Sequence, residues 1–224
     1  MLRYLSVPFR IFSDVIKLFV IYMPGGLGFR LRYFYYKYRL KNIGKNVKID
    51  VGVHIDGAEL ISIGSNVHID KYCVIATGKK LIGKISKKNN PDYTGDTGEI
   101  IIGDDVHIAQ FCILMGYGGI SIGNKCVTSA GCKLYSLTNT SNDPSDPEEV
   151  ISIQPYNQAP FLLAPIVLNE NTWLGLNVIL MPLVSIGKDS FCVSNSLVTQ
   201  SFSENSYLAG QPARIIGNRF ENYV

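Results

Sequence analysis

Apolar residues recur at every sixth position along most of this chain. Written in sixes from Ile43, the sequence begins IGKNVK, IDVGVH, IDGAEL, and the same frame returns as IGSNVH, IDKYCV, IGDDVH, IAQFCI, IGNKCV and IGKDSF. A period of six fits neither an α-helix nor the simple alternation of a single strand. It fits a short strand followed by a tight turn, with three such units forming one triangular coil of roughly 18 residues. The pattern predicts stacked short parallel strands over residues 43–76 and 100–200.

The same hexads predict which side chains fill the interior. The aliphatic residue at the first place of each hexad should stack on its counterpart in the next coil, while Gly, Asn or Asp at the following places tolerates the positive φ of a tight turn. The five cysteines form no CxxC pair, and four of them occupy small inward-facing positions, so we expect buried thiols and not disulfides. The expected core includes Ile63, Ile69, Ile102, Ile108, Ile122, Leu168, Leu174, Leu180 and Ile186.

Three segments interrupt the frame. Residues 77–99 are basic and polar, residues 115–119 read MGYGG, and residues 136–165 are rich in Pro, Asn and Ser. Insertions in a stacked repeat fall on loops and often on the binding face, and a loop as long as 136–165 is usually functional. We therefore expect these segments to border the functional site.

Charge sets the N-terminal segment apart from the rest of the chain. Residues 1–48 carry ten Lys or Arg and one acid, Asp14, whereas the remainder carries eleven basic and seventeen acidic residues. Within residues 29–39 the basic side chains alternate with Phe and Tyr, a mixture that suits a membrane interface with anionic lipids. The apolar run from Val15 to Met23 is too short, and is broken by Lys17, for a spanning helix.

These features predict a helical, basic and aromatic arm over residues 1–41 that contacts a membrane peripherally, with Arg3, Arg10 and Lys17 on one stripe. The alternative is a helical cap that packs on the open end of the repeat or on a neighbouring subunit. Nucleic acid is not an expected partner, because no nucleic-acid motif is present. The chain start lacks a secretory signal, so we expect a cytoplasmic location on the inner face of the cytoplasmic membrane. Residues 42–217 then form the repeat domain, and residues 218–224 a tail.

The frame also aligns outward-facing positions in neighbouring coils. A general base that acts near neutral pH is most often a histidine. The chain has His54, His68 and His107, of which His107 is nearest in coil order to the interruptions at 115–119 and 136–165. The positions predicted to share one outward column are Lys48, His68, His107, Val127, Trp173 and Phe191.

The hexads, the NTWLG sequence at 171–175, the AGQPARIIG sequence at 209–217 and the long loop together resemble the hexapeptide-repeat acyltransferases, above all the O-acetyltransferases of bacterial surface polysaccharides. The resemblance covers about residues 43–217. It implies a mainly β fold, the left-handed parallel β-helix, and a homotrimer with active sites in clefts between neighbouring β-helices. It also implies acetyl-CoA as the donor, lying along the groove, and a sugar or polysaccharide as the acceptor, with no metal.

The resemblance also suggests site residues. The family's base is typically a histidine in the long loop, but this position holds Asn139 or Thr140, so we expect His107 to act as the base and Asn139 to orient the acceptor. For the donor, the resemblance implies Trp173 near the thioester and Gly175 beside the cofactor. It further implies Arg214 on a phosphate of coenzyme A and Thr199 in the last coil, where Gln200 replaces the family's Lys.

The expected activity is acetyl-CoA-dependent O-acetylation of a sugar in a bacterial surface polysaccharide or its lipid-linked precursor. One alternative is N-acylation of a nucleotide-linked amino sugar, and another is a non-catalytic β-helix scaffold, which the missing loop histidine would explain. A zinc site like that of carbonic anhydrases with a similar fold would need a close histidine pair, and the spacing of His54, His68 and His107 along the chain argues against one.

Overall fold

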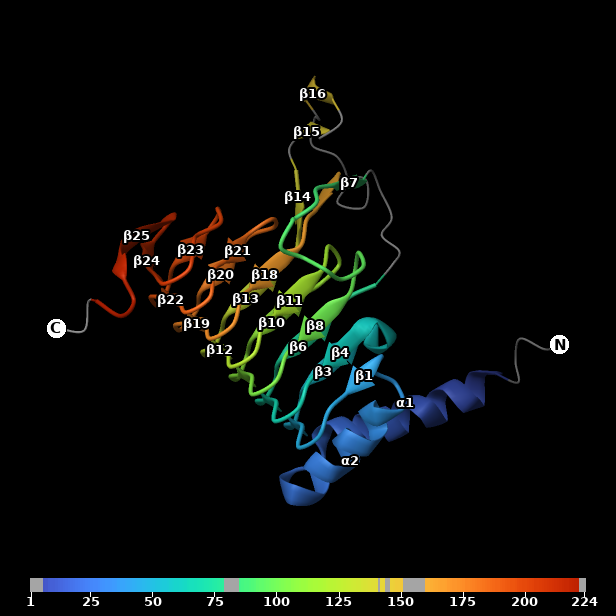
Figure 1. The fold of residues 1–224 in the computed structure, drawn as a ribbon. Coiled ribbons are helices and arrows are strands. Elements are labelled where there is room, and N and C mark those ends of the chain that lie inside the picture. The colour runs from blue at the N-terminus through green and yellow to red at the C-terminus, as the bar shows by residue number, and fades with distance from the viewer. Residues whose placement is uncertain (1–5, 79–84, 141, 144–145, 151–159, 222–224) are drawn as a thin grey trace.

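The computed structural model describes residues 6–78, 85–140, 142–143, 146–150 and 160–221. The chain winds through three parallel sheets, here called sheets A, B and C, and forms a left-handed β-helix with two helices at its N-terminal end (Figure 1). Each coil passes from sheet A to sheet B to sheet C. The predicted architecture is therefore confirmed.

The strands are short, as the hexad spacing requires. Sheet A contains β1 (Asn42–Ile43), β4 (Ile61–Ile63), β8 (Ile100–Ile102), β11 (Ile120–Ile122), β18 (Ile166–Leu168) and β21 (Ser185–Ile186). Sheet B contains β2 (Lys48–Ile49), β5 (His68–Ile69), β9 (His107–Ile108), β12 (Val127–Thr128), β19 (Trp173–Leu174), β22 (Phe191–Cys192), β24 (Ser206–Gly210) and β25 (Ala213–Asn218). Sheet C contains β3 (His54–Asp56), β6 (Val74–Ala76), β10 (Ile113–Met115), β13 (Lys133–Tyr135), β20 (Ile179–Leu180) and β23 (Leu197–Val198).

The core is a narrow column of aliphatic side chains that runs the length of the coils. All nine predicted core residues are buried, and none is more than 2% exposed. The five cysteines are also buried and free, which confirms the prediction of thiols over disulfides. Because burying one aliphatic side chain contributes about 1.5–3 kcal/mol, the stacked first places of the hexads supply much of the stability.

The N-terminal helices α1 (Ser6–Tyr22) and α2 (Gly25–Lys37) lie across the first coil (Figure 1). Arg32 of α2 is fully buried and donates hydrogen bonds to the carbonyl oxygens of Ile49, Val20, Ile21 and Met23. One guanidinium therefore satisfies backbone groups of α1, of the connection and of the first coil at once. Helix α2 thus caps the open end of the β-helix, as the alternative interpretation of the arm expected.

Every interruption of the frame leaves the β-helix at one edge, where the chain passes from sheet C to sheet A. This C–A edge carries the 3₁₀ turn Ala58–Leu60, the segment 77–99, the turn 116–119 and the loop 136–165. In the described parts of these insertions, β7 (Ile85–Lys87), β14 (Leu137–Asn139) and β17 (Phe161–Leu163) form a small sheet, and β15 (Asn142–Asp143) pairs with β16 (Asp146–Val150). The small sheet and the β15–β16 pair project away from the coils of the β-helix (Figure 1).

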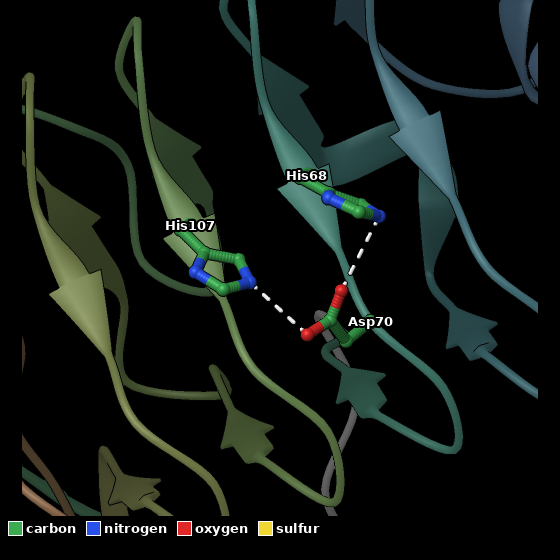
Figure 2. A group of neighbouring side chains, drawn as sticks. All are labelled: His68, Asp70 and His107. Atoms are coloured by element: carbon green, nitrogen blue, oxygen red, sulfur yellow. Dashed lines mark hydrogen bonds and ion pairs between the residues drawn. The ribbon is translucent and has the colours of Figure 1, made fainter.

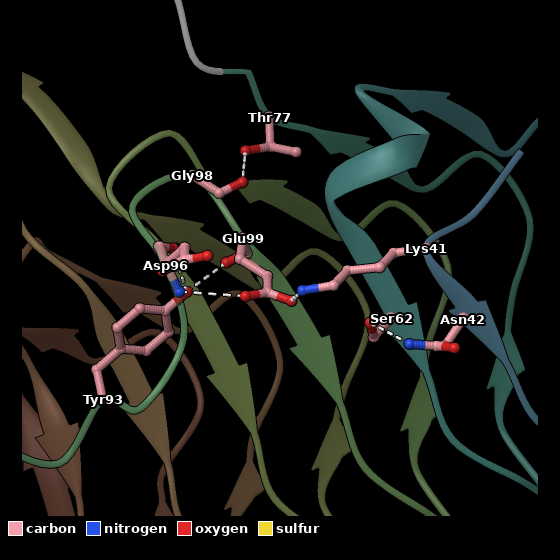
Figure 3. A network of polar contacts seen from close by, with 8 residues as sticks. All are labelled: Lys41, Asn42, Ser62, Thr77, Tyr93, Asp96, Gly98 and Glu99. Carbon is pink, nitrogen blue, oxygen red and sulfur yellow. Dashed lines mark hydrogen bonds and ion pairs between the residues drawn. The ribbon is translucent and has the colours of Figure 1, made fainter.

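A polar network holds the base of the 77–99 segment against the coils. Glu99 has a nearly buried carboxylate that pairs with Lys41, which raises the pKa of Lys41 chiefly through that hydrogen bond (Figure 3). The Tyr93 hydroxyl donates to the carbonyl oxygens of Glu99 and Asp96 at 2.7 and 3.0 Å, and burial is the main cause that raises the pKa of Tyr93. The segment is therefore anchored at its C-terminal end.

Candidate active site

The predicted outward column exists on sheet B. Parallel pairing aligns Lys48 with His68, His68 with His107, and His107 with Val127. The alignment continues from Val127 to Trp173 and from Trp173 to Phe191. Tyr207 extends the column by one further coil. Since neighbouring strands lie about 4.8 Å apart, side chains in adjacent coils of this column can touch.

His68, Asp70 and His107 form a cluster at the N-terminal part of this column (Figure 2). His107 Nε2 is hydrogen-bonded to Asp70 Oδ2 at 3.0 Å. His68 Nε2 lies 3.2 Å from Oδ1 of the same carboxylate but without hydrogen-bond alignment. The two imidazole rings stack with centroids 5.6 Å apart, and Phe29 of α2 packs against the edge of His68 at 6.2 Å. Both rings are nearly half exposed, whereas Asp70 is mostly covered.

Asp70 is a candidate site residue that the sequence did not identify. It directly follows β5, at the second place of its hexad, where Asp was assigned to turn formation. In the next coil the corresponding position is Ala109, whose side chain leaves space for the carboxylate to turn toward His107. A signal was present, because an acid two residues after an outward histidine and beside a small residue can reach the histidine of the neighbouring coil.

The cluster corrects one inference from the sequence. The spacing of the histidines along the chain suggested no close pair, yet the register places His68 and His107 side by side. Their ring nitrogens and the Asp70 carboxylate lie within 4.8 Å of one another, so these three side chains have the spacing of metal ligands. The error arose because chain separation says little about distance when each coil returns to the same face.

His54 belongs to a different part of the surface. It lies on sheet C, where its Nε2 is 2.8 Å from Asp56 Oδ2. Asp56 also forms an ion pair with Lys17 of α1 at 3.6 Å. His54 therefore joins α1 to the first coil and does not contribute to the cluster on sheet B.

The C-terminal half of the column is aromatic. Trp173 is 43% exposed, and its indole N–H donates to Ser129 Oγ at 3.2 Å. Its ring packs against Phe191 at 6.1 Å, and Phe191 stacks on Tyr207 at 5.3 Å. These rings give coils five to seven a continuous apolar strip on the same face as the histidines.

Gly175 has a structural explanation that does not involve a cofactor. A Cβ at this position would lie 2.6 Å from the backbone nitrogen of Ser194 and 2.9 Å from the carbonyl oxygen of Cys192. Such contacts with the next coil cannot be relieved by moving a side chain. The glycine is therefore required by the stacking of coils, and contact with a donor remains a prediction.

Thr199 and Arg214 lie at the C-terminal end of the β-helix, and both are exposed. Arg214 is in β25, which folds back antiparallel on β24, and its Nη1 donates to the carbonyl oxygen of Ala213 at 2.8 Å. Because Arg214 is exposed, its other guanidinium donors are accessible to an anion. Thr199 follows β23 at the end of sheet C.

Asn139 and His107 do not lie on the same face of the chain. Asn139 is exposed in β14, which leaves from the C–A edge and pairs with β17. His107 lies in β9 of sheet B, the sheet opposite that edge. The expectation that the interruptions at 115–119 and 136–165 would wall a pocket around His107 is therefore wrong within a single chain, because coil order does not specify the edge from which a loop leaves.

Comparisons with known proteins agree on the chemistry. The chain matches no protein-family model. It is 30% identical over 141 residues to a putative acetyltransferase of Dictyostelium discoideum. The aligned residues make up 62% of this chain and 69% of the relative. A dTDP-4-amino-4,6-dideoxy-D-glucose acyltransferase of Escherichia coli is 26% identical over 184 residues, with 80% and 82% coverage. A putative lipopolysaccharide biosynthesis O-acetyl transferase of Escherichia coli K12, WbbJ, is 28% identical, with 53% and 60% coverage.

Solved structures show the same fold. A point mutant of the N-acyltransferase AntD of Bacillus cereus, in complex with dTDP and coenzyme A, superposes with a TM-score of 0.64 at 25% identity, covering 84% of this chain and 89% of AntD. A hexapeptide-repeat acetyltransferase of Vibrio cholerae in complex with acetyl-CoA superposes with a TM-score of 0.53 at 20% identity, over 92% and 84% of the two chains.

Proposed function

Because this chain belongs to the hexapeptide-repeat acyltransferases, which use a coenzyme A thioester as donor, we propose that it transfers an acetyl group from acetyl-CoA to a sugar hydroxyl. The proposed acceptor is a bacterial surface polysaccharide or its lipid-linked precursor. The observation that carries the proposal is the hydrogen bond between His107 and Asp70 on the exposed face of sheet B. An imidazole oriented by a carboxylate is the arrangement that general-base catalysis requires.

The pair suggests a complete proton path. With its Nε2–H donated to Asp70, His107 keeps the Nδ1 lone pair free, and Figure 2 shows that nitrogen on the side of the ring away from Asp70. The imidazole accepts the acceptor's hydroxyl proton as the oxygen attacks the thioester carbonyl. The tetrahedral intermediate then collapses with cleavage of the C–S bond, and the imidazolium returns the proton to the thiolate. Asp70 stabilises the imidazolium while it exists.

A homotrimer would complete this site. Asn139 lies at the edge opposite His107 in one chain, so its amide would have to orient the acceptor bound at a neighbouring subunit of the proposed trimer. The donor would lie along the groove between subunits, with its thioester near Trp173 and Gly175, and its phosphate near Arg214 and Thr199. An exposed tryptophan beside an apolar strip suits the wall of such a cleft.

A second candidate function has specific support. The relative with 80% coverage of this chain is named for acylation of a nucleotide-linked amino sugar, and AntD is an N-acyltransferase that was solved with dTDP. An acceptor amine must lose a proton just as a hydroxyl does, so the His107–Asp70 pair suits both reactions. The acceptor therefore decides between O-acetylation and N-acylation.

We further propose that α1 contacts a membrane surface peripherally. Its exposed apolar side chains are all 40–62% exposed, and Lys17 of the same helix is ion-paired with Asp56 of the first coil. They are Ile11, Phe12, Val15, Ile16, Leu18, Phe19 and Tyr22. Within the described residues, no helix has both the length and the hydropathy needed to cross a bilayer. An apolar helix face with nearby cations binds anionic interfaces. Arg3 lies outside the described residues.

Removal of residues 1–18 tests the membrane contact. The shortened chain keeps Val20 and Ile21, whose carbonyl oxygens accept hydrogen bonds from Arg32, so α2 should still cap the first coil and the chain should remain folded. It should no longer sediment with vesicles that contain anionic lipid. Full-length protein with Lys17 replaced by Gln is the matched control and should lose only part of its binding. Equal sedimentation of the shortened and full-length chains would show that α1 is not a membrane contact.

A coenzyme A release assay tests the reaction. Acetyl-CoA is incubated with a lipid-linked oligosaccharide precursor, with dTDP-4-amino-4,6-dideoxyglucose, and with no acceptor. Acceptor-dependent thiol release with the first substrate supports O-acetylation, and release with the second supports the alternative. Acetyl-CoA binding by calorimetry without release for any acceptor would indicate the non-catalytic scaffold.

A further inference from the structure

The corner between sheets B and C requires a left-handed residue in each coil. At this B–C corner φ lies between 56° and 77° in six coils, a region that Gly and Asn tolerate and aromatic residues rarely adopt. Four coils follow that rule, whereas the second and third place Tyr72 and Phe111 there. The corner residues are Gly52, Tyr72, Phe111, Gly131, Asn177 and Asn195. Within the described residues, no other aromatic residue has positive φ.

The two exceptional residues form a single exposed platform. The rings of Tyr72 and Phe111 are nearly parallel, at 7°, with centroids 5.8 Å apart, and they remain 49% and 58% exposed. Tyr72 lies over Gly52, where a Cβ would come within 2.3 Å of its ring. On the other side the stack ends at Gly131, which has no side chain to continue it. Two adjacent coils therefore accept backbone strain to present aromatic rings to solvent.

The platform borders a groove that reaches Asp70, the carboxylate of the proposed catalytic pair. The groove has a volume of about 420 Å³. Its lining consists of Asp50, Asp70, Lys71, Tyr72, Gln110 and Phe111. Asp70 belongs to both features, because its carboxylate lines the groove and accepts the hydrogen bond from His107. A ring held in the groove would thus lie against the carboxylate that orients His107.

We propose that this groove holds the pyranose ring of the acceptor sugar, with the apolar C–H face of the sugar on the rings of Tyr72 and Phe111. This inference rests on the proposed function and identifies its acceptor site. Asp50 and Gln110 offer hydrogen-bond acceptors and a donor to the ring hydroxyls. Aromatic walls with a few placed polar groups are the usual composition of a small-molecule site.

The charges in the groove indicate which sugars it accepts. Two carboxylates, Asp50 and Asp70, face one ammonium group, that of Lys71. A sugar that carries its own carboxylate would meet net negative charge, whereas a neutral or amino sugar would not. The groove therefore selects neutral and amino hexoses over uronic acids.

Glycine substitutions separate recognition from folding. Phe111→Gly and Tyr72→Gly remove the rings and also relieve the left-handed strain, so the melting temperature should change little in either variant. Asn195→Gly is the matched control, because it also introduces glycine at the left-handed position of the B–C corner. Asn195 lies in a coil far from the groove along the β-helix. Each full-length protein is titrated by calorimetry with the methyl glycosides of glucose, glucosamine and glucuronic acid.

The wild type should bind the neutral and amino glycosides more tightly than the uronate. Phe111→Gly and Tyr72→Gly should each weaken the binding of the neutral and amino glycosides by at least about tenfold and raise KM for the acceptor by a similar factor. Neither substitution should change KM for acetyl-CoA. The Asn195→Gly variant should bind the glycosides as the wild type does. Unaltered sugar binding in both variants, or wild-type protein that binds none of the glycosides, would overturn the proposal. So would loss of oligomeric assembly with sugar affinity intact, since the rings would then be a subunit interface.

The possible results distinguish a failure of the proposed sugar groove from a failure of the proposed acetyl transfer. Sugar binding that depends on the rings, without any coenzyme A release by the wild type, supports the groove and contradicts the proposed activity. Coenzyme A release that is unchanged in both ring variants supports the activity and contradicts the groove.

Discussion

The two halves of the outward column on sheet B differ in chemistry although equivalent backbone positions carry them. The N-terminal half presents His68 and His107 beside the Asp70 carboxylate, and the C-terminal half presents the rings of Trp173, Phe191 and Tyr207. A β-helix fixes where these positions point but leaves their identity free, because only the inward places must pack. One face can therefore combine a polar site for proton transfer with an apolar strip for a long donor.

We expect substitutions in the N-terminal, polar half of the column to lower turnover, and substitutions at the C-terminal end of the β-helix to lower donor affinity. The largest effect is expected at His107. His107→Ala should reduce kcat by roughly 10² to 10⁴, the usual contribution of a general base, with little change in acetyl-CoA affinity. Steady-state kinetics with the acceptor identified by the release assay measure both quantities.

His68→Ala and His54→Ala are the controls for that substitution. Neither imidazole has a hydrogen bond to Asp70, so both variants should retain turnover close to that of the wild type. If His107→Ala also turned over normally, the base would be another group or water, and the division between the two halves would fail.

Asp70→Asn should have the next largest effect. An amide of the same shape can still approach His107 but cannot stabilise the imidazolium, so kcat should fall by about 10². Asp50→Asn, which removes the neighbouring carboxylate of the groove, is the matched control and should change acceptor KM more than kcat. An Asp70→Asn enzyme with normal kcat and a normal pH profile would show that the carboxylate only supports the fold.

At the C-terminal end of the β-helix, Arg214→Ala should weaken acetyl-CoA binding more than it weakens binding of 3′-dephospho-acetyl-CoA. Loss of one charge-assisted hydrogen bond costs about 1.5–3 kcal/mol, which corresponds to roughly ten- to hundredfold in affinity. Arg219→Ala, which alters a guanidinium bonded to Asn171 and Ser190, provides a control in the same region. Equal losses for the two donors would remove Arg214 from that phosphate.

The smallest effect is expected from metal removal. His68, Asp70 and His107 have the spacing of metal ligands, but acyl transfer by this family needs no metal. Treatment with EDTA should leave kcat unchanged, and added Zn²⁺ should inhibit by competing for the His107 lone pair. Loss of activity with EDTA and its recovery with Zn²⁺ would assign the cluster to a metal and exclude His107 as the base.

The sequence by itself determined the coils, the core and the outward column. The six-residue period specified the inward side chains, because a narrow triangular interior accepts only aliphatic and small residues at fixed places. All nine predicted core residues are buried, and the pairing of His107 with Val127 and of Val127 with Trp173 follows the predicted frame. Periodicity is a local property, so a single sequence contains it completely.

Only the tertiary structure decided how residues of different coils meet. It placed Asp70 against His107, although the hexad pattern had assigned that aspartate to a turn. It buried Arg32 between the helices and the first coil, where the sequence suggested a lipid-facing cation. It also put Asn139 and the insertions at the edge opposite His107. Side-chain direction and the edge from which a loop leaves depend on neighbouring coils, and these relations are not encoded in any one hexad.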